Sequence, residues 1–455
     1  MTVRDGAGRM LEAVRGREAR QLIDNATSVL GTTVVTSLLG AVFWAVAARS
    51  MSAANIGIGA SVISAMLLLA RLGALGMPTM LAGELHRFEG RERQLILAST
   101  GIAVVLGSGL GVIFGSIASA ASGPGTSIDQ IVLFALGVAV TAAGIVLDGA
   151  FVGLLRGWLG FARNAIASLV KLLIVVAFVA TAQPGFGSAT LLIATVVGVM
   201  GSLAVVRWLP RTDRSGAVTP RVMGLLQDGI GHLAFRHYAI NLAVLAPSLM
   251  LPLIVAALAS AEASGYFYVA STVAALAFAI PGALVFALFA VGSRTGSDFG
   301  ASFRLSLAVS ALLCAIAGIG IAVFADPILS FFGPAYASSS VSVLRAFMLG
   351  LPAVIVISHY LAVARLEHRF AVATVLIGAG AVIQVGCVAV GARLDGLTGA
   401  TVGWLVGTGL SVLPLVSTVV RAARGAVIRP GSDRAAGVVD SAWADADLLP
   451  RADET

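Results

Sequence analysis

Long apolar runs recur through almost the whole of this 455-residue sequence. A helix needs about twenty apolar residues to cross the hydrocarbon core of a bilayer, where its own hydrogen bonds must satisfy every backbone amide. Breaks of Gly, Pro or charged residues separate twelve such runs. They lie near 26–48, 54–76, 95–118, 129–154, 164–182, 189–209, 238–259, 265–291, 304–324, 339–361, 370–391 and 397–420. The pattern predicts an all-α polytopic membrane protein with about twelve transmembrane helices.

The low charge of the chain indicates the same class. Only 11% of the residues are charged, whereas 58% are hydrophobic, and the mean hydropathy is +0.99. A soluble domain needs more charge on its surface. The formal net charge of +7 could attract nucleic acid, but no soluble segment carries a basic stripe interleaved with aromatic residues. We therefore expect contact with a membrane and none with nucleic acid.

The Lys and Arg residues predict the orientation in the membrane. Short cytoplasmic loops are enriched in these residues. With the amino terminus inside, nearly all of the 29 Lys and Arg residues fall in cytoplasmic segments, and only Arg49 and Arg393 face outward. We expect a multi-pass protein of the inner (cytoplasmic) membrane with both termini in the cytoplasm.

Two short sequence matches indicate an internal repeat. Residues 52–57 (Ser-Ala-Ala-Asn-Ile-Gly) match residues 260–265 (Ser-Ala-Glu-Ala-Ser-Gly) at an offset of 208. Residues 156–162, after the fourth run, align with residues 365–371, after the tenth, at an offset of 209. Two matches at nearly one offset favour duplication of a six-helix unit. Because six is even, both copies enter the membrane from the same side and are related by an axis along the membrane normal.

The repeat predicts how the chain is divided. Two parallel-repeat six-helix lobes should enclose a central cavity, and rocking of one lobe against the other would open it to either side. The expected segments are a cytoplasmic amphipathic amino-terminal segment (1–25), an N-lobe (26–209), a cytoplasmic linker (210–237), a C-lobe (238–420) and a disordered cytoplasmic tail (421–455).

Several turns carry a resemblance to a known family. Residues 331–337 (Phe-Phe-Gly-Pro-Ala-Tyr-Ala) precede a Val-Leu-Arg at 343–345, residues 394–400 read Leu-Asp-Gly-Leu-Thr-Gly-Ala, and residues 152–171 contain Gly153, Arg156, Trp158, Arg163 and Asn164. In this order, with the turn at 52–57, they resemble the multidrug/oligosaccharidyl-lipid/polysaccharide (MOP) exporter superfamily and its oligosaccharide flippases over residues 20–425. Ala53 and Ala54 stand where the family turn has Pro and Glu. The resemblance implies translocation of a polyprenyl-diphosphate-linked oligosaccharide to the outer leaflet.

Three cations within the predicted spans are candidate substrate-binding residues: Arg71, Lys171 and Arg345. A cation at mid-bilayer costs about 2.5 to 3.5 kcal/mol on insertion scales, so each needs a partner or a wet cavity. Arg71, about 7 to 8 Å from the inner end of its run, could instead reach the interface, and so could Arg345 at the outer side. Asp148 is a candidate ion-pair or proton site, and a structural pair with Lys171 is the alternative to a functional role.

These features lead to one functional hypothesis and two alternatives. The first is a lipid-linked oligosaccharide flippase working by alternating access, for envelope polysaccharide such as lipopolysaccharide, with a polysaccharide polymerase and glycosyltransferases as expected partners. A related drug/cation antiporter should have a cavity rich in carboxylates, and a third possibility is a non-transporting scaffold of a polysaccharide assembly complex. No catalytic constellation or metal-ligand spacing occurs in the sequence, so we expect no enzyme, cofactor or metal.

Overall fold

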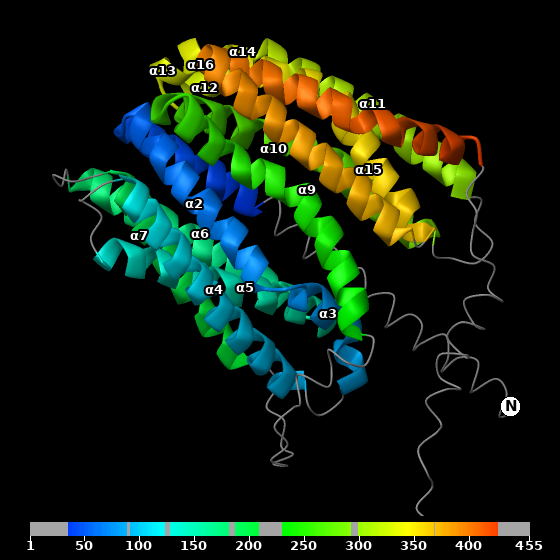
Figure 1. Ribbon diagram of the computed structural model, residues 1–455, viewed down its shortest axis with the longest axis horizontal. Helices are drawn as coiled ribbons and strands as arrows, with labels where there is room; N and C mark the ends of the chain where they lie inside the picture. The colour runs from blue at the N-terminus through cyan, green and yellow to red at the C-terminus, as the bar shows by residue number, and fades with distance from the viewer. Residues whose placement is uncertain are drawn as a thin grey trace, which may run out of the picture.

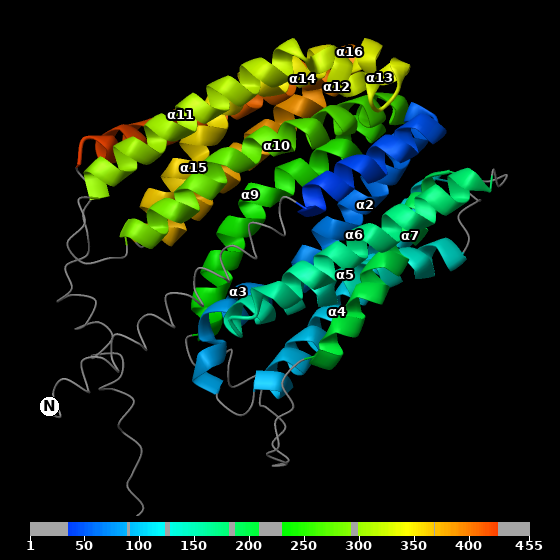
Figure 2. The ribbon, with the colours of Figure 1, turned by 180° about the vertical axis from the view of Figure 1, so that it is seen from behind.

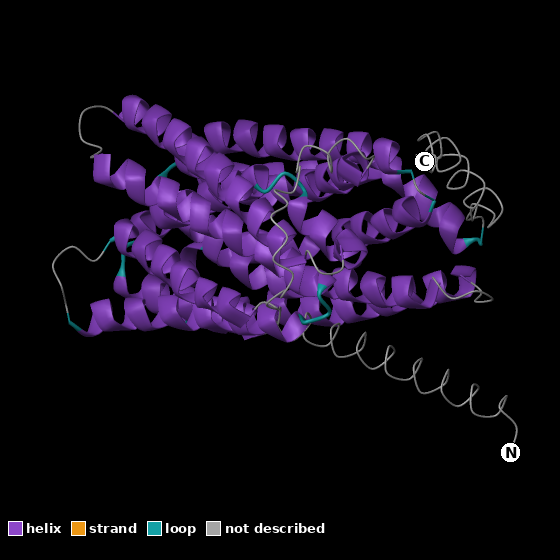
Figure 3. Ribbon diagram, turned by 90° about the horizontal axis from the view of Figure 1, so that it is seen from below, coloured by secondary structure: helices purple, strands orange, loops and turns teal. Residues whose placement is uncertain are grey.

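The computed structural model describes residues 35–88, 92–122, 128–181, 187–208, 230–292, 299–367 and 369–425. These residues form helices joined by turns, and no strand occurs among them (Figure 3). The predicted amino-terminal segment 1–25, most of the linker 210–237 and the tail beyond 425 lie outside the described residues.

The helices follow the predicted apolar runs closely. In chain order they are a first helix Val35–Ser50, α2 (Ala53–Gly73), α3 (Met77–Glu84), η1 (Leu85–Phe88), α4 (Glu92–Ser122), α5 (Ile128–Gly153), α6 (Gly157–Ala180), α7 (Ser188–Ser202), η2 (Leu203–Trp208), α9 (Ile230–Leu258), α10 (Ala261–Gly292), α11 (Phe299–Val323), α12 (Ala325–Ser330), α13 (Pro334–Ser339), α14 (Val341–Leu349), α15 (Leu351–Leu366) and α16 (Phe370–Ala423).

The number of spans agrees with the prediction. Nine described helices are long and apolar enough to cross a membrane, or ten if the bent pair α14 and α15 counts as one span. The long α16 contains two helices, because Asp395 and Gly396 between them have non-helical backbone angles. With the first helix, these elements account for each of the twelve apolar runs, so the all-α fold of about twelve spans is confirmed.

The helices gather into two bundles (Figures 1 and 2). The helices up to α7 form one bundle, and α10 to α16 form the other. Helix α2 of the first bundle packs against α10 of the second, while α9 runs along the boundary in contact with both α2 and α16. The contacts between the two bundles therefore involve mainly α2, α9, α10 and α16.

The first pair of repeated segments adopts the same local structure twice. The Ser52 Oγ accepts a hydrogen bond from the Asn55 amide at 3.3 Å, and the Ser260 Oγ accepts one from the Ala263 amide at 3.0 Å. A serine in this position caps a helix amino terminus by satisfying an amide that has no partner within the helix. The shared cap at the start of α2 and of α10 supports the predicted duplication.

The second pair needs a correction of its register. Arg156 directly precedes α6, and its amide donates to the Phe151 carbonyl at 2.9 Å. The residue with the same geometry in the second half is Arg369, which directly precedes α16 and donates to the Ala364 carbonyl at 2.9 Å. The sequence alignment of Arg156 with Arg365 is wrong by four residues, because the half-repeats differ in length between the capped serines and this turn.

Short helices occupy places where loops were expected. The outer segment 325–338 holds α12 and α13, and residues after the second span form α3, which packs on α5. Gly149 and Gly153 make this packing possible, since a Cβ at either would collide with the α3 backbone at Pro78 or Leu81. The tenth span bends by 43° between α14 and α15, where Pro352 lies in the first turn of α15.

Candidate functional site

A cavity of about 200 Å³, here called the inner cleft, lies between the two halves near their expected cytoplasmic side. Residues of α2, α3 and α5 line one wall and residues of α9 line the other. Its lining residues are Arg71, Ala74, Gly76, Pro78, Thr79, Ile145, Tyr238, Asn241, Leu242 and Leu245. Arg71 is thus one candidate residue that lines a cavity between the halves.

The turn after α2 places Arg71 at this cleft. Leu75 and Gly76 have positive φ angles of 44° and 77°, which reverse the chain directly into α3. The Tyr238 hydroxyl of α9 then donates to the Arg71 carbonyl at 3.1 Å or the Leu72 carbonyl at 3.2 Å. This bond across the boundary joins α9 to the end of α2 and leaves the half-buried Arg71 side chain facing the cleft.

A second arginine near the cleft was not selected from the sequence. The Arg365 Nη2 donates to the Asn241 Oδ1 at 3.1 Å, and Asn241 also lines the inner cleft. Neither Arg71 nor Arg365 forms an ion pair with a described carboxylate. The apolar runs predict Arg365 in a loop between residues 361 and 370, but it lies in the last turn of α15, as Arg71 lies in the last turn of α2.

Asp148 has a different partner from the one expected. The Arg163 guanidinium donates to both carboxylate oxygens of Asp148, at 2.8 and 2.5 Å, and the Asn164 amide donates to Oδ1 at 3.1 Å. The Arg163 side chain is only 6% exposed, and Gly144 provides its space because a Cβ there would meet Nη1. The expected pair of Asp148 with Lys171 is therefore wrong, and Arg163 belongs to the bundle interior and not to a loop.

Lys171 lies against an aromatic ring. Its Nζ is 4.9 Å from the ring centroid of Phe43 in the first helix, a cation–π distance. Gly198 of α7 flanks the lysine backbone. Lys171 does not line the inner cleft, so it is not brought together with Arg71.

Arg345 lies near the expected outer side of the protein. Its Nε donates to the Ala322 carbonyl at 3.1 Å, and its Nη2 is 3.6 Å from the Asp326 carboxylate. The two side chains are 52% and 63% exposed, so this pair resembles an ordinary surface salt bridge. The structure places the three candidate cations in three separate environments, and only Arg71 faces the inner cleft.

The halves are closed against each other at their expected outer side. A Cβ on Gly57 of α2 would collide with the Ala261 carbonyl of α10, and one on Gly265 would collide with the Ala53 carbonyl. The repeated segments 52–57 and 260–265 therefore contact each other, glycine facing glycine. We call this contact the outer seam.

Hydrogen bonds continue the outer seam toward the bundle interior. The Ser264 hydroxyl donates to the Pro252 carbonyl at 2.8 Å, and the Ser61 hydroxyl reaches the same carbonyl at 3.0 Å. The two hydroxyl oxygens are 3.4 Å apart. At the surface, Arg49 donates to the Phe331 carbonyl at 2.8 Å. The two halves are thus held together at their expected outer side, while the inner cleft lies between them near the expected cytoplasmic side.

Comparison with solved structures identifies the fold. The chain is similar to the inward-facing conformation of a multidrug resistance MATE family transporter of the MOP superfamily, with a TM-score of 0.69 and 13% identity over 87% of this chain and 98% of that chain. An outward-facing conformation of such a transporter gives 0.57 and 14% over 89% and 96%. A MOP superfamily transporter from Pyrococcus furiosus, described as having a binding pocket of reverse polarity, gives 0.59 and 14% over 88% and 96%.

The helical bundles, the seam and the cleft therefore define a multi-pass membrane protein with the MATE-type transporter fold. A family model described as polysaccharide biosynthesis protein matches residues 22–291, more than half of the chain. The chain belongs to this polysaccharide biosynthesis protein family, and its fold is similar to that of the MOP superfamily transporters. A comparison with curated protein sequences finds no match.

Proposed function

We propose that this protein is a flippase that moves a polyprenyl-diphosphate-linked oligosaccharide from the cytoplasmic to the outer leaflet of the inner membrane. The observation that carries the proposal is the inner cleft, which Arg71 lines and where Arg365 donates to the lining residue Asn241. Neither arginine forms an ion pair with a described carboxylate, and Asp148, whose charge acts on Arg71, is itself paired with Arg163. Two guanidinium groups at a partly desolvated cleft, neither in an ion pair with a described carboxylate, favour an anionic ligand, and a diphosphate suits their fork geometry.

The charge of the bundle interior supports an anionic substrate over a cationic one. Among the described residues, Asp148 is the one carboxylate that lies well inside a span, and Arg163 neutralises it through two hydrogen bonds. A transporter of organic cations needs a carboxylate that is free to bind substrate or a coupling ion. In this chain that carboxylate is already occupied by an internal cation.

The closed outer seam and the open inner cleft fit the cytoplasm-facing state of an alternating-access cycle. The higher TM-score against an inward-facing than against an outward-facing transporter agrees with this assignment. In this state the headgroup enters from the cytoplasm while its lipid tail stays in the bilayer. Opening of the outer seam then releases the headgroup outside.

The membrane potential can supply the driving force. Each elementary charge that crosses the membrane changes the free energy by about 2.3 kcal/mol per 100 mV. Because the cell interior is negative, outward movement of an anionic headgroup is downhill. No chemical step is required, and the protein acts as a transporter without catalytic residues.

The proposed setting is envelope polysaccharide assembly, such as that of lipopolysaccharide, with both termini of the chain in the cytoplasm. Glycosyltransferases would complete the glycan on the cytoplasmic side, and a polysaccharide polymerase would use it on the outer side. The family description of polysaccharide biosynthesis protein supports this setting.

The first prediction concerns the two arginines of the inner cleft. In proteoliposomes containing a fluorescent polyprenyl-diphosphate oligosaccharide, we expect Arg71→Ala and Arg365→Ala each to slow translocation about tenfold or more, since a hydrogen bond to a charged group contributes about 1.5 to 3 kcal/mol. A membrane-impermeant quencher would measure the rate. Arg421→Ala is the matched control, because this exposed arginine at the end of α16 donates only to Thr418 of its own helix. Equal rates for all three variants would refute the proposal.

A drug/cation antiporter is the second candidate, favoured by the similarity to a multidrug resistance transporter. It predicts uptake of organic cations into proteoliposomes driven by a proton or sodium gradient, with no movement of lipid-linked sugar. A non-transporting scaffold would move neither substrate. The same vesicles therefore separate all three functions.

A further inference from the structure

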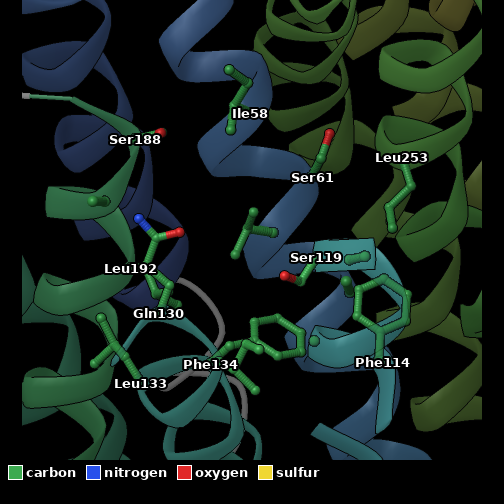
Figure 4. A pocket seen from close by; sticks show the side chains of 16 residues that line it. Ile58, Ser61, Phe114, Ser119, Gln130, Leu133, Phe134, Ser188, Leu192 and Leu253 are labelled. Carbon is green, nitrogen blue, oxygen red and sulfur yellow. The ribbon is translucent and has the colours of Figure 1, made fainter. Parts of the chain in front are cut away.

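A second cavity, of about 440 Å³, lies within the first bundle and apart from the inner cleft (Figure 4). Four helices of that bundle, α2, α4, α5 and α7, provide all but one of its lining residues, and α9 contributes the other. The lining residues are Ile58, Ser61, Val62, Ala65, Phe114, Gly115, Ala118, Ser119, Gln130, Ile131, Leu133, Phe134, Ser188, Ala189, Leu192 and Leu253. We call it the side cavity. No residue lines both cavities.

The side cavity lies at the depth of the outer leaflet. It is bounded by the end of α4 and the beginnings of α2, α5 and α7, which are all expected to lie at the outer face. Ile58, which lines the cavity, is 43% exposed. Apolar side chains exposed to this degree on a membrane-spanning surface face lipid. We therefore expect the cavity to adjoin the hydrocarbon of the bilayer.

Polar groups occupy the rim of the side cavity and apolar groups its interior. Ser119 lies near the end of α4, while Gln130 and Ser188 lie in the first turns of α5 and α7. None of these three side chains forms a hydrogen bond within the described parts of the chain, and Gln130 is exposed while Ser119 and Ser188 are half-buried. Phe114 and Phe134, with ring centroids 5.6 Å apart, form part of the apolar interior.

The apolar interior and polar rim of the side cavity suit an amphiphile, which has an apolar chain and a polar end. The volume is within the range of about 300 to 1,000 Å³ that small-molecule sites occupy. An empty apolar void would forfeit the dispersion contacts of its lining, and neighbouring hydrocarbon can restore them. The unpaired serines and glutamine at the rim can bond the oxygen atoms of a phosphate or ester group.

We propose that the side cavity binds one hydrocarbon chain of a membrane amphiphile, whose polar end is hydrogen-bonded at Gln130 and Ser188 in the outer leaflet. The ligand is either a polyprenyl phosphate or a glycerophospholipid, since both carry an apolar chain and a phosphate. Binding here goes beyond the proposed transport reaction and does not require it, because the inner cleft shares no residue with the cavity.

The side cavity also touches the outer seam. Ser61 lines the cavity and bonds the Pro252 carbonyl in the seam, and the next residue, Leu253, is the lining residue from α9. A chain bound in the cavity would thus contact the closed seam directly. Occupancy is expected to favour the inward-facing state in which these contacts exist.

Photochemical cross-linking of the full-length protein in nanodiscs tests the proposal. One arm uses a polyprenyl phosphate with a diazirine in its chain, and the other a phosphatidylethanolamine with a diazirine in one acyl chain. Peptide mass spectrometry should locate label on the segments around Phe114 and Leu192. Label from one probe or from both identifies the source of the chain, and absence of label on these segments from both probes would overturn the proposal.

Variants that fill the side cavity with a larger side chain are compared with the wild type in the same labelling experiment. Ala118 and Ala189 are exposed alanines of the lining, so Ala118→Leu and Ala189→Leu place added carbon in the cavity without displacing packed atoms. We expect labelling of the lining segments to fall about tenfold. Ala120→Leu, an exposed position on α4 outside the lining, should label like the wild type.

A third variant guards against a loss caused by misfolding. Gln130→Leu removes an unpaired and exposed side chain, so the fold should be unaffected, while label from the polyprenyl phosphate should decrease. Unchanged labelling in all three cavity variants would contradict the proposal. Thermal unfolding of each variant would show that the protein is folded in the comparison.

Discussion

At the scale of single residues, the pair of Asp148 and Arg163 makes the clearest energetic prediction. Asp148→Asn leaves the Arg163 guanidinium, which is 6% exposed, without its counter-charge. Breaking a buried pair costs about 3 to 5 kcal/mol, and the 37% exposure of Asp148 favours the lower end of that range. We expect a lower thermal unfolding midpoint in detergent. The double variant Asp148→Asn with Arg163→Gln should recover most of the loss, and Asp395→Asn, at the exposed turn within α16, should have no effect. A double variant less stable than Asp148→Asn would argue against this explanation.

The sequence predicted that Asp148 could form an ion pair, but it did not identify Arg163 as the partner. Asp148 and Arg163 lie at matched depths, because α5 ends at Gly153 and α6 begins at Gly157. The apolar run placed the start of this helix at residue 164, which moved Lys171 to the depth of Asp148. With the observed start, Lys171 lies eight residues beyond Arg163, about 12 Å deeper at 1.5 Å per residue. Side-chain pairing in a membrane depends on helix ends, and hydropathy locates those poorly.

At the scale of helices, the outer seam depends on two glycines. Gly57→Val in α2 would drive its side chain into the Ala261 carbonyl, which belongs to the backbone of α10 and cannot rotate away. We expect the seam to stay open and translocation to fall more than tenfold. Labelling of a cysteine at Ser61 by an impermeant maleimide added outside should rise. Gly109→Val in α4 is the control, since nothing lies within 4 Å of an added Cβ there. Inhibition by Gly109→Val as strong as by Gly57→Val would remove the special role of the seam.

At the scale of helices, the sequence predicted some features and missed others. The repeat at 52–57 and 260–265 was visible as a pattern, but the sequence did not show that the two copies contact each other. The break at Asp395 and Gly396 matched a predicted turn. Helices α12 and α13 were missed because segments of six residues each are too short for apolar periodicity to identify.

At the scale of the whole molecule, the two halves contact each other at the outer seam and leave a cavity between them at the inner cleft. Hydropathy and the positive-inside rule predicted the spans and their orientation, and the internal repeat predicted two lobes. Neither could indicate which side is closed, because both states of a transporter share one sequence and differ by a few contacts. Those contacts are the glycine seam at 52–57 and 260–265 and the serine pair beneath it.

A covalent cross-link between the halves at the outer seam should stop the alternating-access cycle. The serine pair is a suitable place for this cross-link. The Ser61 and Ser264 hydroxyl oxygens are 3.4 Å apart, so sulfur atoms in their places, after Ser61→Cys and Ser264→Cys, need only a small shift to reach the disulfide bond length of about 2.05 Å. The native Cys314 and Cys387 are first replaced by alanine. We expect oxidant to abolish translocation of lipid-linked sugar in proteoliposomes and a reductant to restore it, while either single cysteine is unaffected. If the halves move as rigid lobes, the oxidised protein can still bind polyprenyl diphosphate at the inner cleft, because the lock holds that side open. Full transport by the oxidised double variant would show that substrate crosses without opening the outer seam.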